Sequence, residues 1–240
     1  TNYSVVLKKG DTRIPVVAAE ADSSLELEVT QASSIPGVAT VKVSSIIGAK
    51  TYNITFGYAP TSDDFMDGTM DSEWKILNPD PENYSLEAGK GLRLATLEGD
   101  IHQTGTNWKN VFIRPAAGDW DVVMKVYYPQ APFENYQQIA MLVWQDDNNY
   151  LKMDCEFNSG LSIQFAREIN GSFSAIGSDA PARDEDGSLT VYYRIIKSGN
   201  TYTGMYSQDG VNYKQLGSPV VINLSNTHIG VFATKSGATA

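Results

Sequence analysis

The chain has 240 residues, of which 42% are hydrophobic and 19% charged, a composition typical of a folded globular protein rather than a disordered one. Its net charge of -10 lies wholly after residue 60, because residues 1–60 carry five basic and five acidic side chains. An acidic domain repels phosphate backbones, so nucleic acid is not an expected partner, whereas neutral plant or microbial glycans remain open. No stretch of the sequence is long and apolar enough to predict a membrane span.

Residues 1–58 predict a small β-sandwich. Alternating, β-branched segments without a helical pattern indicate five short strands. These are Tyr3–Lys8, Pro15–Ala19, Leu25–Gln31, Ala39–Ser45 and Lys50–Phe56. Residues 59–62 are predicted to be a linker, and residues 63–240 a second, larger domain.

The larger domain predicts an all-β sandwich or jelly roll. Short strand candidates recur about every 8–12 residues between turn signals such as Asn170-Gly171 and Asp209-Gly210. Outside the central hairpin the candidates are Trp74–Asn78, Tyr84–Glu87, Gly91–Ala95, Asn110–Pro115, Trp120–Tyr127, Leu161–Glu168, Thr190–Lys197, Thr201–Ser207, Lys214–Leu216 and His228–Ala233.

Residues 138–157 predict a central β-hairpin with a four-residue loop, Asp146–Asn149. The first arm, Ile139–Trp144, is apolar almost throughout, which favours a position in the middle of a sheet. In the second arm Leu151, Met153, Cys155 and Phe157 alternate with Lys152, Asp154 and Glu156, so apolar and charged side chains face opposite sides. We call Lys152, Asp154 and Glu156 the polar row, and it is the strongest candidate for a binding site.

A sugar site needs planar apolar surface together with polar groups that hold pairs of hydroxyls. Trp144 ends the first arm and is a candidate platform, while Gln164 alternates with apolar neighbours and is expected to share the polar face. Arg114 interrupts an apolar strand and needs a partner, for which Asp154 or Glu156 across the sheet is expected. The predicted ligand-binding set is Arg114, Trp144, Lys152, Asp154, Glu156 and Gln164.

Asp154 and Glu156 are also separated by roughly 6.6–6.8 Å at Cα, which is compatible with a catalytic carboxylate pair. However, Lys152 on the same face is expected to keep both carboxylates ionised, which is poor for a general acid. No catalytic residue is therefore assigned. An ordinary solvated surface and a glycosidase or polysaccharide lyase both remain alternatives for this face.

Two further features concern metals and thiols. Asp63 and Asp64 open the larger domain in an acidic segment and predict a structural Ca²⁺ site, although the spacing is not that of an EF-hand. No cofactor is predicted to be required. Cys155 is the only cysteine, so no internal disulfide is possible, and its alternating position predicts a buried apolar side chain.

Two resemblances add to these predictions. YSVVLKKGDTRIPVVAAEA, VTQASSIPGVATVKVSS and KTYNITFGY resemble the immunoglobulin-like or cadherin-like spacer modules of bacterial secreted enzymes. In the larger domain the matching segments are DDFMDGTMDSEWKILNP, LRL, VFIRP, IAMLVWQDDNNYLKM, REINGSF, VYYRIIKSGNTYTGMYSQDGVNYKQLG and HIGVFAT. They resemble the concanavalin-like β-sandwich found C-terminal in glycoside hydrolase family 43 enzymes, which is related to family 66 carbohydrate-binding modules.

The resemblances imply an immunoglobulin-like sandwich lacking its first strand, followed by a concanavalin-like jelly roll lacking its last. The implied function is that of a non-catalytic carbohydrate-binding module in a secreted, multimodular polysaccharide-degrading protein. Its expected partners are a polysaccharide and covalently linked catalytic or surface modules, and the expected localisation is secreted or cell-surface in a bacterium. The alternatives are a structural or adhesive segment of a bacterial surface protein, and the glycosidase or lyase named above.

Overall fold

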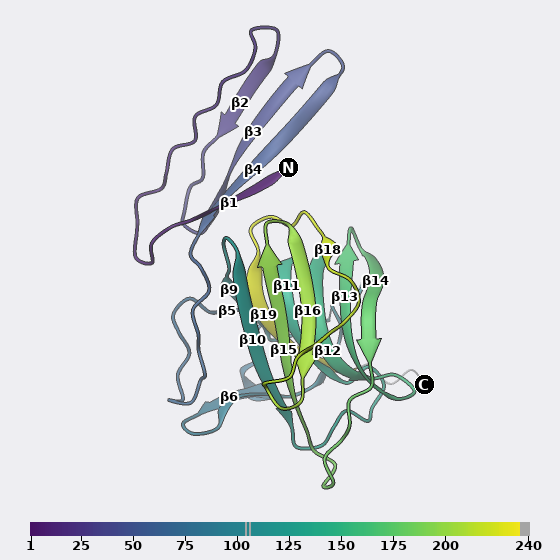
Figure 1. The fold of residues 1–240 in the computed structure, drawn as a ribbon. Coiled ribbons are helices and arrows are strands. Elements are labelled where there is room, and N and C mark those ends of the chain that lie inside the picture. Colours follow the sequence, from purple (N-terminus) through teal and green to yellow (C-terminus); the bar gives the residue numbers. More distant parts are fainter. Residues whose placement is uncertain (104, 106, 236–240) are drawn as a thin grey trace.

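The computed structural model describes residues 1–103, 105 and 107–235. A small sheet formed by residues 2–57 stands over one end of a larger two-layer sandwich (Figure 1). Within the described residues the secondary structure is β apart from one 3₁₀ turn, η1 (Pro81–Asn83). The all-β class expected from the sequence is confirmed.

The small sheet has four strands in the order β1-β4-β3-β2, with β1 parallel to β4 and the other pairs antiparallel. The strands are β1 (Asn2–Val6), β2 (Glu26–Thr30), β3 (Gly37–Ser45) and β4 (Gly48–Gly57). Its core is small and centres on Ala32, Ala39 and Phe56. Because these strands form a single sheet, the immunoglobulin-like assignment stays a prediction.

The predicted strand Pro15–Ala19 is wrong, since this segment joins no sheet. The side-chain amide of Gln31 takes the place of a neighbouring strand. It accepts a hydrogen bond from Val17 N at 2.8 Å and donates one to Val17 O at 2.7 Å. The Gln31 side chain therefore holds residues 15–19 in place, where we expected backbone hydrogen bonds to a neighbouring strand.

The sandwich consists of two sheets and a short separate ribbon. The five-stranded sheet runs β10-β15-β16-β17, and β18 also pairs with β16. The eight-stranded sheet runs β14-β13-β12-β11-β19-β9-β5, and β8 also pairs with β19. The first sheet contains β10 (Trp120–Tyr128), β15 (Leu189–Ser198), β16 (Thr201–Ser207), β17 (Lys214–Gln215) and β18 (Val220–Val221). The second contains β5 (Lys75–Leu77), β8 (Leu97–Glu98), β9 (Val111–Pro115), β11 (Gln138–Asp146), β12 (Asn149–Phe157), β13 (Leu161–Ile169), β14 (Ser172–Asp179) and β19 (His228–Lys235). The ribbon contains β6 (Tyr84–Glu87) and β7 (Gly91–Leu94).

The main hydrophobic core lies between the two sheets. Every second residue of β12 points into it, including Leu151, Met153 and Cys155, which are all fully buried. Tyr128 of the five-stranded sheet crosses the core, donating to backbone carbonyls of Ile139 and Cys155 at 3.2 and 3.3 Å. The predicted burial of Cys155 is confirmed.

The central hairpin forms as expected, with a tighter turn. β11 lies between β12 and β19, which confirms its predicted place in the middle of a sheet. The turn contains only Asp147 and Asn148, because Asp146 and Asn149 still pair as strand residues. Asp146 Oδ1 accepts hydrogen bonds from Asn148 N and Asn149 Nδ2 at 2.9 and 2.8 Å, which closes the turn locally.

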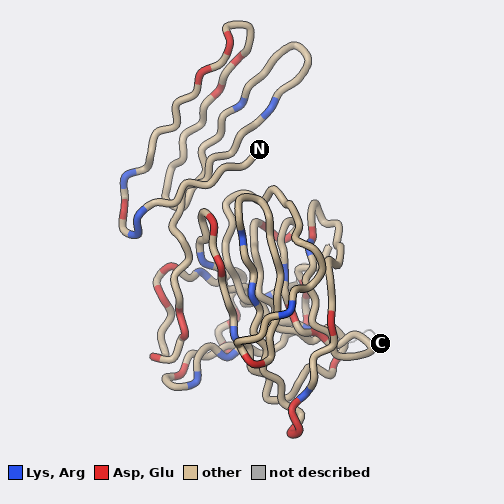
Figure 2. Tube along the Cα trace, in the orientation of Figure 1, with Lys and Arg blue, Asp and Glu red and all other residues tan. Residues whose placement is uncertain are grey.

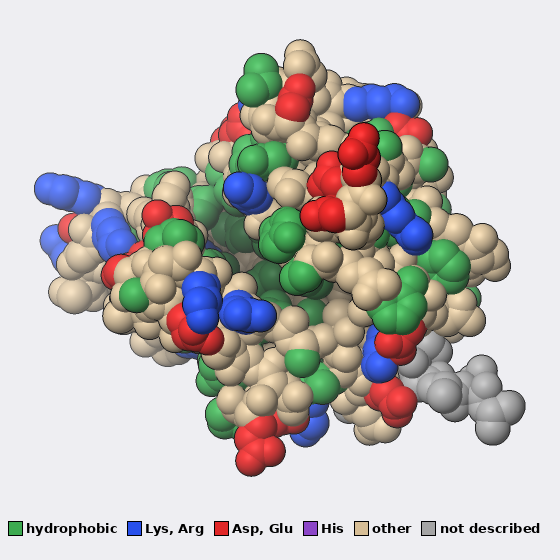
Figure 3. All heavy atoms as spheres, turned by 90° about the horizontal axis from the view of Figure 1, so that it is seen from below, with side chains coloured by type: hydrophobic (Ala, Val, Ile, Leu, Met, Phe, Trp, Pro, Cys, Tyr) green, Lys and Arg blue, Asp and Glu red, His purple; other side chains and the backbone are tan. Residues whose placement is uncertain are grey.

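The surface carries an acidic segment and, at one end of the sandwich, an apolar hollow. In Figure 2 a run of acidic residues marks the chain that leads from the small sheet into the sandwich. Seen from below in Figure 3, the end of the sandwich away from the small sheet is hollowed, with hydrophobic side chains on the floor. No helix in the described residues is long and apolar enough to cross a membrane.

Candidate functional site

The polar row lies on the outer face of the eight-stranded sheet, opposite the main core. Strand pairing places Asp154 beside Gln164 and Ala140, Lys152 beside Leu142 and Ala166, and Glu156 beside Gln138 and Ser162. Directly paired residues of antiparallel strands point to the same face. The sheet therefore brings together four of the predicted residues, Lys152, Asp154, Glu156 and Gln164, and adds Gln138.

These side chains form one connected cluster. Lys152 Nζ lies 2.7 Å from Asp154 Oδ2 and donates to Gln138 Oε1 at 2.8 Å. Gln138 Nε2 in turn donates to Glu156 Oε2 at 3.4 Å. By strict hydrogen-bond geometry neither Asp154 oxygen has a donor among the described residues, although Lys152 and Gln164 both act to lower the pKa of Asp154. A buried carboxylate in this state is uncommon and marks a place where function is to be sought.

The polar row is buried, so the alternative of an ordinary solvated surface is wrong. Lys152, Asp154 and Glu156 are 7%, 0% and 9% exposed. The segment that follows β8 contributes the buried Ile101 and is held against this face by Glu168, whose carboxylate accepts hydrogen bonds from Gln103 N at 2.8 and 3.0 Å. Tyr150 donates to the same carboxylate at 3.1 Å.

Burial changes the protonation of the row. It raises the pKa of Glu156 from 4.5 to about 7, with a further contribution from the charge of Asp154, while Lys152 acts in the opposite direction. Burial likewise raises the pKa of Asp154 despite the neighbouring ammonium. Burial alone would lower the pKa of Lys152, but the surrounding carboxylates raise it. Desolvation therefore outweighs the influence of Lys152 on the pKa of both carboxyl groups, contrary to the expectation that Lys152 dominates.

This predicts a pH-dependent stability. A folded-state pKa raised from 4.5 to about 7 stabilises the fold below pH 4.5, and that stabilisation is lost as the pH rises to about 7. With allowance for solvent screening, we expect the free energy of unfolding to fall by about 1–2 kcal/mol across this window. In Glu156→Gln that fall should largely disappear. Urea unfolding at a series of pH values checks this. If the free energy of unfolding fell equally with pH in the native protein and in Glu156→Gln, the prediction would be contradicted.

Two predicted ligand residues do not reach the site as expected. Trp144 is buried, stacked on Tyr150 with ring centroids 6.0 Å apart and covered edge-on by Trp108 at 5.9 Å, so it is not an open platform. Arg114 pairs with Ile229, whose side chain faces the main core, and therefore lies on the opposite face from the polar row.

Arg114 has other partners than the expected Asp154 or Glu156. Its Nη2 donates to Glu73 Oε2 at 2.6 Å and to Asp71 Oδ2 at 3.4 Å, and its guanidinium lies 5.1 Å from the centre of the Trp74 ring. The expected pairing across the sheet is therefore wrong. Arg114, on β9, instead binds residues 71–74 of the acidic segment that begins at Asp63, which we call the entry segment.

The acidic entry segment uses its carboxylates as turn acceptors. Asp63 accepts hydrogen bonds from Phe65 N, Asp71 N and Trp74 Nε1 at 2.9–3.0 Å, and Asp64 accepts one from Met66 N at 3.0 Å. Among the described residues no three or more His, Cys, Asp or Glu side chains are grouped to hold a metal. Structural calcium at Asp63 and Asp64 stays a prediction from the sequence.

Beside the Glu156 end of the polar row lies an exposed aromatic residue that the sequence did not single out. Tyr136 is 43% exposed and has a positive φ of 54°, which is uncommon for a non-glycine residue. Its carbonyl accepts a hydrogen bond from Gln138 Nε2 at 3.1 Å, and its N–H donates to Phe157 O at 2.7 Å. The backbone of this exposed residue thus adjoins the buried Gln138–Glu156 pair. Only the positive φ marks it out, and sequence periodicity does not report that.

The two packed β-sheets, with a short ribbon at one side, define a concanavalin-like sandwich. The sequence profile of the beta-xylosidase C-terminal concanavalin A-like domain family matches residues 62–235, and the chain belongs to this family. No curated protein matches the chain in a direct comparison.

Solved structures agree on the fold. The GH43 protein BlXynB from Bacillus licheniformis matches with a TM-score of 0.64 and 17% identity, over 94% of this chain and 53% of that chain. The xylan β-1,4-xylosidase from Bacillus halodurans matches with a TM-score of 0.62 and 14% identity, over 90% and 52%. A Bacteroides ovatus xyloglucan PUL protein, GH43B, matches with a TM-score of 0.59 and 17% identity, over 82% of this chain and 48% of that chain. The chain spans about half the length of these proteins.

Proposed function

We propose that the chain is a non-catalytic carbohydrate-binding module of a secreted, polysaccharide-degrading protein. It holds a glycan at the Glu156 end of the polar row, where the exposed Tyr136 borders the buried Gln138 and Glu156. One observation carries this proposal: a desolvated carboxylate and amide on the face of a β-xylosidase-type sandwich are bonded to the backbone of an exposed tyrosine, Tyr136. A sugar ring stacks on the aromatic surface while its hydroxyls bond to the polar pair.

The cost of burying the cluster supports a functional reading. Removing ions from water costs several kcal/mol for each ion, and apolar side chains of similar size would often give a more stable sheet. The chain retains Lys152, Asp154 and Glu156 on this face nonetheless. Asp154 fixes Lys152, and Lys152 fixes Gln138, so the cluster holds the Gln138 side chain beside Glu156.

Xylan is the first ligand to test, because two of the proteins with this fold are named for xylan and xyloglucan. Such a module acts by holding a linked catalytic module near its substrate, so that modest affinity suffices through effective concentration. The linked module, export and bacterial origin are parts of this proposal.

The test is retention of the native chain on insoluble xylan and arabinan, with and without Ca²⁺. We expect Glu156→Gln and Tyr136→Ala each to weaken retention about tenfold, through loss of a charge-assisted hydrogen bond and of a stacking surface. Tyr127→Ala is the matched control, because Tyr127 is also exposed but lies on the outer face of the other sheet. Loss of retention on chelation would support the calcium site as well.

Unchanged retention in both variants, with intact circular dichroism spectra, would refute this site. If the native chain retained no polysaccharide, the structural or adhesive role would become the leading explanation.

A glycosidase or lyase activity is favoured by one observation, the pKa of about 7 for Glu156 beside a second carboxyl group. Full burial of Asp154 opposes it. Product release from xylan that Glu156→Gln abolishes would decide in its favour.

A further inference from the structure

Strand β10 forms an unpaired edge of the five-stranded sheet. It pairs with β15 through nine consecutive residues, and among the described residues no backbone hydrogen bond joins it to any other segment. Along its free side, every second residue therefore has an N–H and a C=O group without a protein partner. Val122 and Met124 point toward the main core but are only partly buried, whereas Ile195 and Tyr193, their partners on β15, are fully buried. The free side of β10 is therefore accessible to water.

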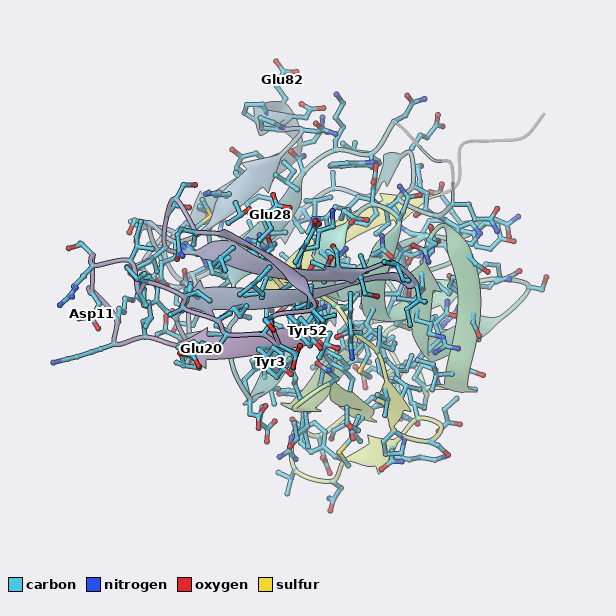
Figure 4. The ribbon with its side chains drawn as sticks, turned by 90° about the horizontal axis from the view of Figure 1, so that it is seen from above. Tyr3, Asp11, Glu20, Glu28, Tyr52 and Glu82 are labelled. Atoms are coloured by element: carbon cyan, nitrogen blue, oxygen red, sulfur yellow. The ribbon has the colours of Figure 1, made fainter. Side chains whose placement is uncertain are left out.

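The other sheet edges are protected in ways that β10 is not. Figure 4 shows from above the two edges of the small sheet, marked by Tyr3 on β1 and Glu28 on β2; each strand has five residues, and β2 also carries Glu26. β14 pairs with β13 across a register irregularity, and the remaining edge strands in the described residues have two to four residues. Short strands, irregularities and charges are the usual means of preventing edge pairing. β10 has nine residues, no proline and no register shift.

The outer face of β10 carries two opposite charges around an apolar centre. Val123 is 48% exposed and lies between Asp121 and Lys125 on this face. Asp121 accepts hydrogen bonds from Arg194 at 2.6 and 2.8 Å. Lys125 has no carboxylate partner among the described residues, and its ammonium group lies 5.7 Å from the centre of the Tyr192 ring. β10 is thus neutral in a chain of net charge -10.

This pattern is complementary to itself. When two copies of a strand pair antiparallel about a two-fold axis, their outer faces lie on the same side only if the register is centred on a residue. Centring on Asp121 or on Lys125 would place like charges opposite each other. Centring on Val123 places Asp121 opposite Lys125 of the second copy, and symmetry repeats the pair. It also places Val122 opposite Met124 on the core side.

We propose that β10 is the interface of a homodimer, in which two copies pair antiparallel through this strand in the register centred on Val123. The two five-stranded sheets then form one continuous sheet, and the free N–H and C=O groups of both strands are paired. The two contacts between Asp121 and Lys125 fix the register. A second copy is the occupant because β10 supplies both halves of each charge pair. No residue of the polar row takes part, so this inference goes beyond the proposed function.

The test is the mass of the full chain by sedimentation equilibrium from about 5 to 500 µM, a range suited to a small interface. We expect the mass to rise from 26.2 kDa toward that of two chains. Lys125→Glu places two acidic side chains opposite each other, and Asp121→Lys places two lysines opposite each other. Each variant alone should raise the Kd of the dimer about tenfold or more. Both positions are exposed, so both variants should fold, which circular dichroism checks.

An equimolar mixture of Lys125→Glu and Asp121→Lys should dimerise again with a Kd close to that of the native chain, because each charge then faces an opposite one. Val123→Lys should prevent association by placing two ammonium groups at the axis. Val211→Lys is the matched control, since Val211 is 78% exposed and lies outside β10, and it should leave the Kd unchanged.

A mass of one chain at all concentrations would overturn the proposal. It would also be overturned by association that Val123→Lys leaves unchanged, or by a mixture of the two charge variants that associates no better than either alone. A mass that continues to rise beyond two chains would show open-ended aggregation instead of the two-fold pairing.

Discussion

Replacing Lys152 by methionine is expected to lower the free energy of unfolding by about 3–5 kcal/mol, because removal of one partner of a buried ion pair leaves the other uncompensated. Asp154 is fully buried and Lys152 is the cation beside it, at 2.7 Å. The loss should be larger at pH 8 than at pH 5, since at the lower pH the raised pKa values allow the carboxyl groups to take up protons. Chemical unfolding at both pH values measures it.

The matched control is Lys125→Met on the exposed face of β10, which should change stability by less than about 0.5 kcal/mol. A second variant, Lys152→Met with Asp154→Asn, removes both charges and should recover most of the loss. A cost below about 1 kcal/mol for the single variant, or no recovery in the double one, would mean that the row is better solvated than its burial indicates.

The second large effect is expected at Gly204 in the middle of β16. A Cβ atom at this position would lie 2.5 Å from Cγ of Phe165, a fully buried ring on the facing sheet. Gly204→Val is therefore expected to cost about 3 kcal/mol, because the close-packed core must move to admit it. Thermal and urea unfolding measure the loss.

Gly160→Val serves as the control for Gly204→Val, because a Cβ atom there meets no atom within 4 Å. Adding Phe165→Leu to Gly204→Val should restore part of the stability by removing ring atoms from the contact. If Gly204→Val were as stable as Gly160→Val, the two sheets would have to pack further apart at this point than the structure has them.

Local pattern in the sequence predicted most of the strands, while tertiary pairing decided the rest. Alternation in residues 151–157 predicted both the strand and its apolar face, because both depend on the two-residue period alone. Edge strand β14 was missed, since it offers only Phe173 and Ile176 as large apolar residues and pairs with β13 across a register irregularity. Phe165, which a side chain at position 204 would clash with, lies on the other sheet, so the sequence around Gly204 does not predict the contact.

The site was predicted in part for the same reason. Spacing placed Lys152, Asp154 and Glu156 on one face, and alternation added Gln164. Whether that face meets water depends on a segment about 50 residues earlier, around Ile101, which no periodicity in β12 can report. Arg114 went to the opposite face because its orientation depends on how β9 pairs with β19. Tyr136 lies in a loop, where periodicity carries no information.

The burial of Cys155 has a practical consequence. Its side chain is fully enclosed between the sheets, and burial raises the pKa of the thiol, so the reactive thiolate is scarce at neutral pH. A water-soluble thiol reagent reaches this sulfur only in molecules whose sandwich has opened. Since the chain has one cysteine, every labelled molecule is one in which the core has opened. The rate of labelling of Cys155 therefore reports local or global opening of the native sandwich.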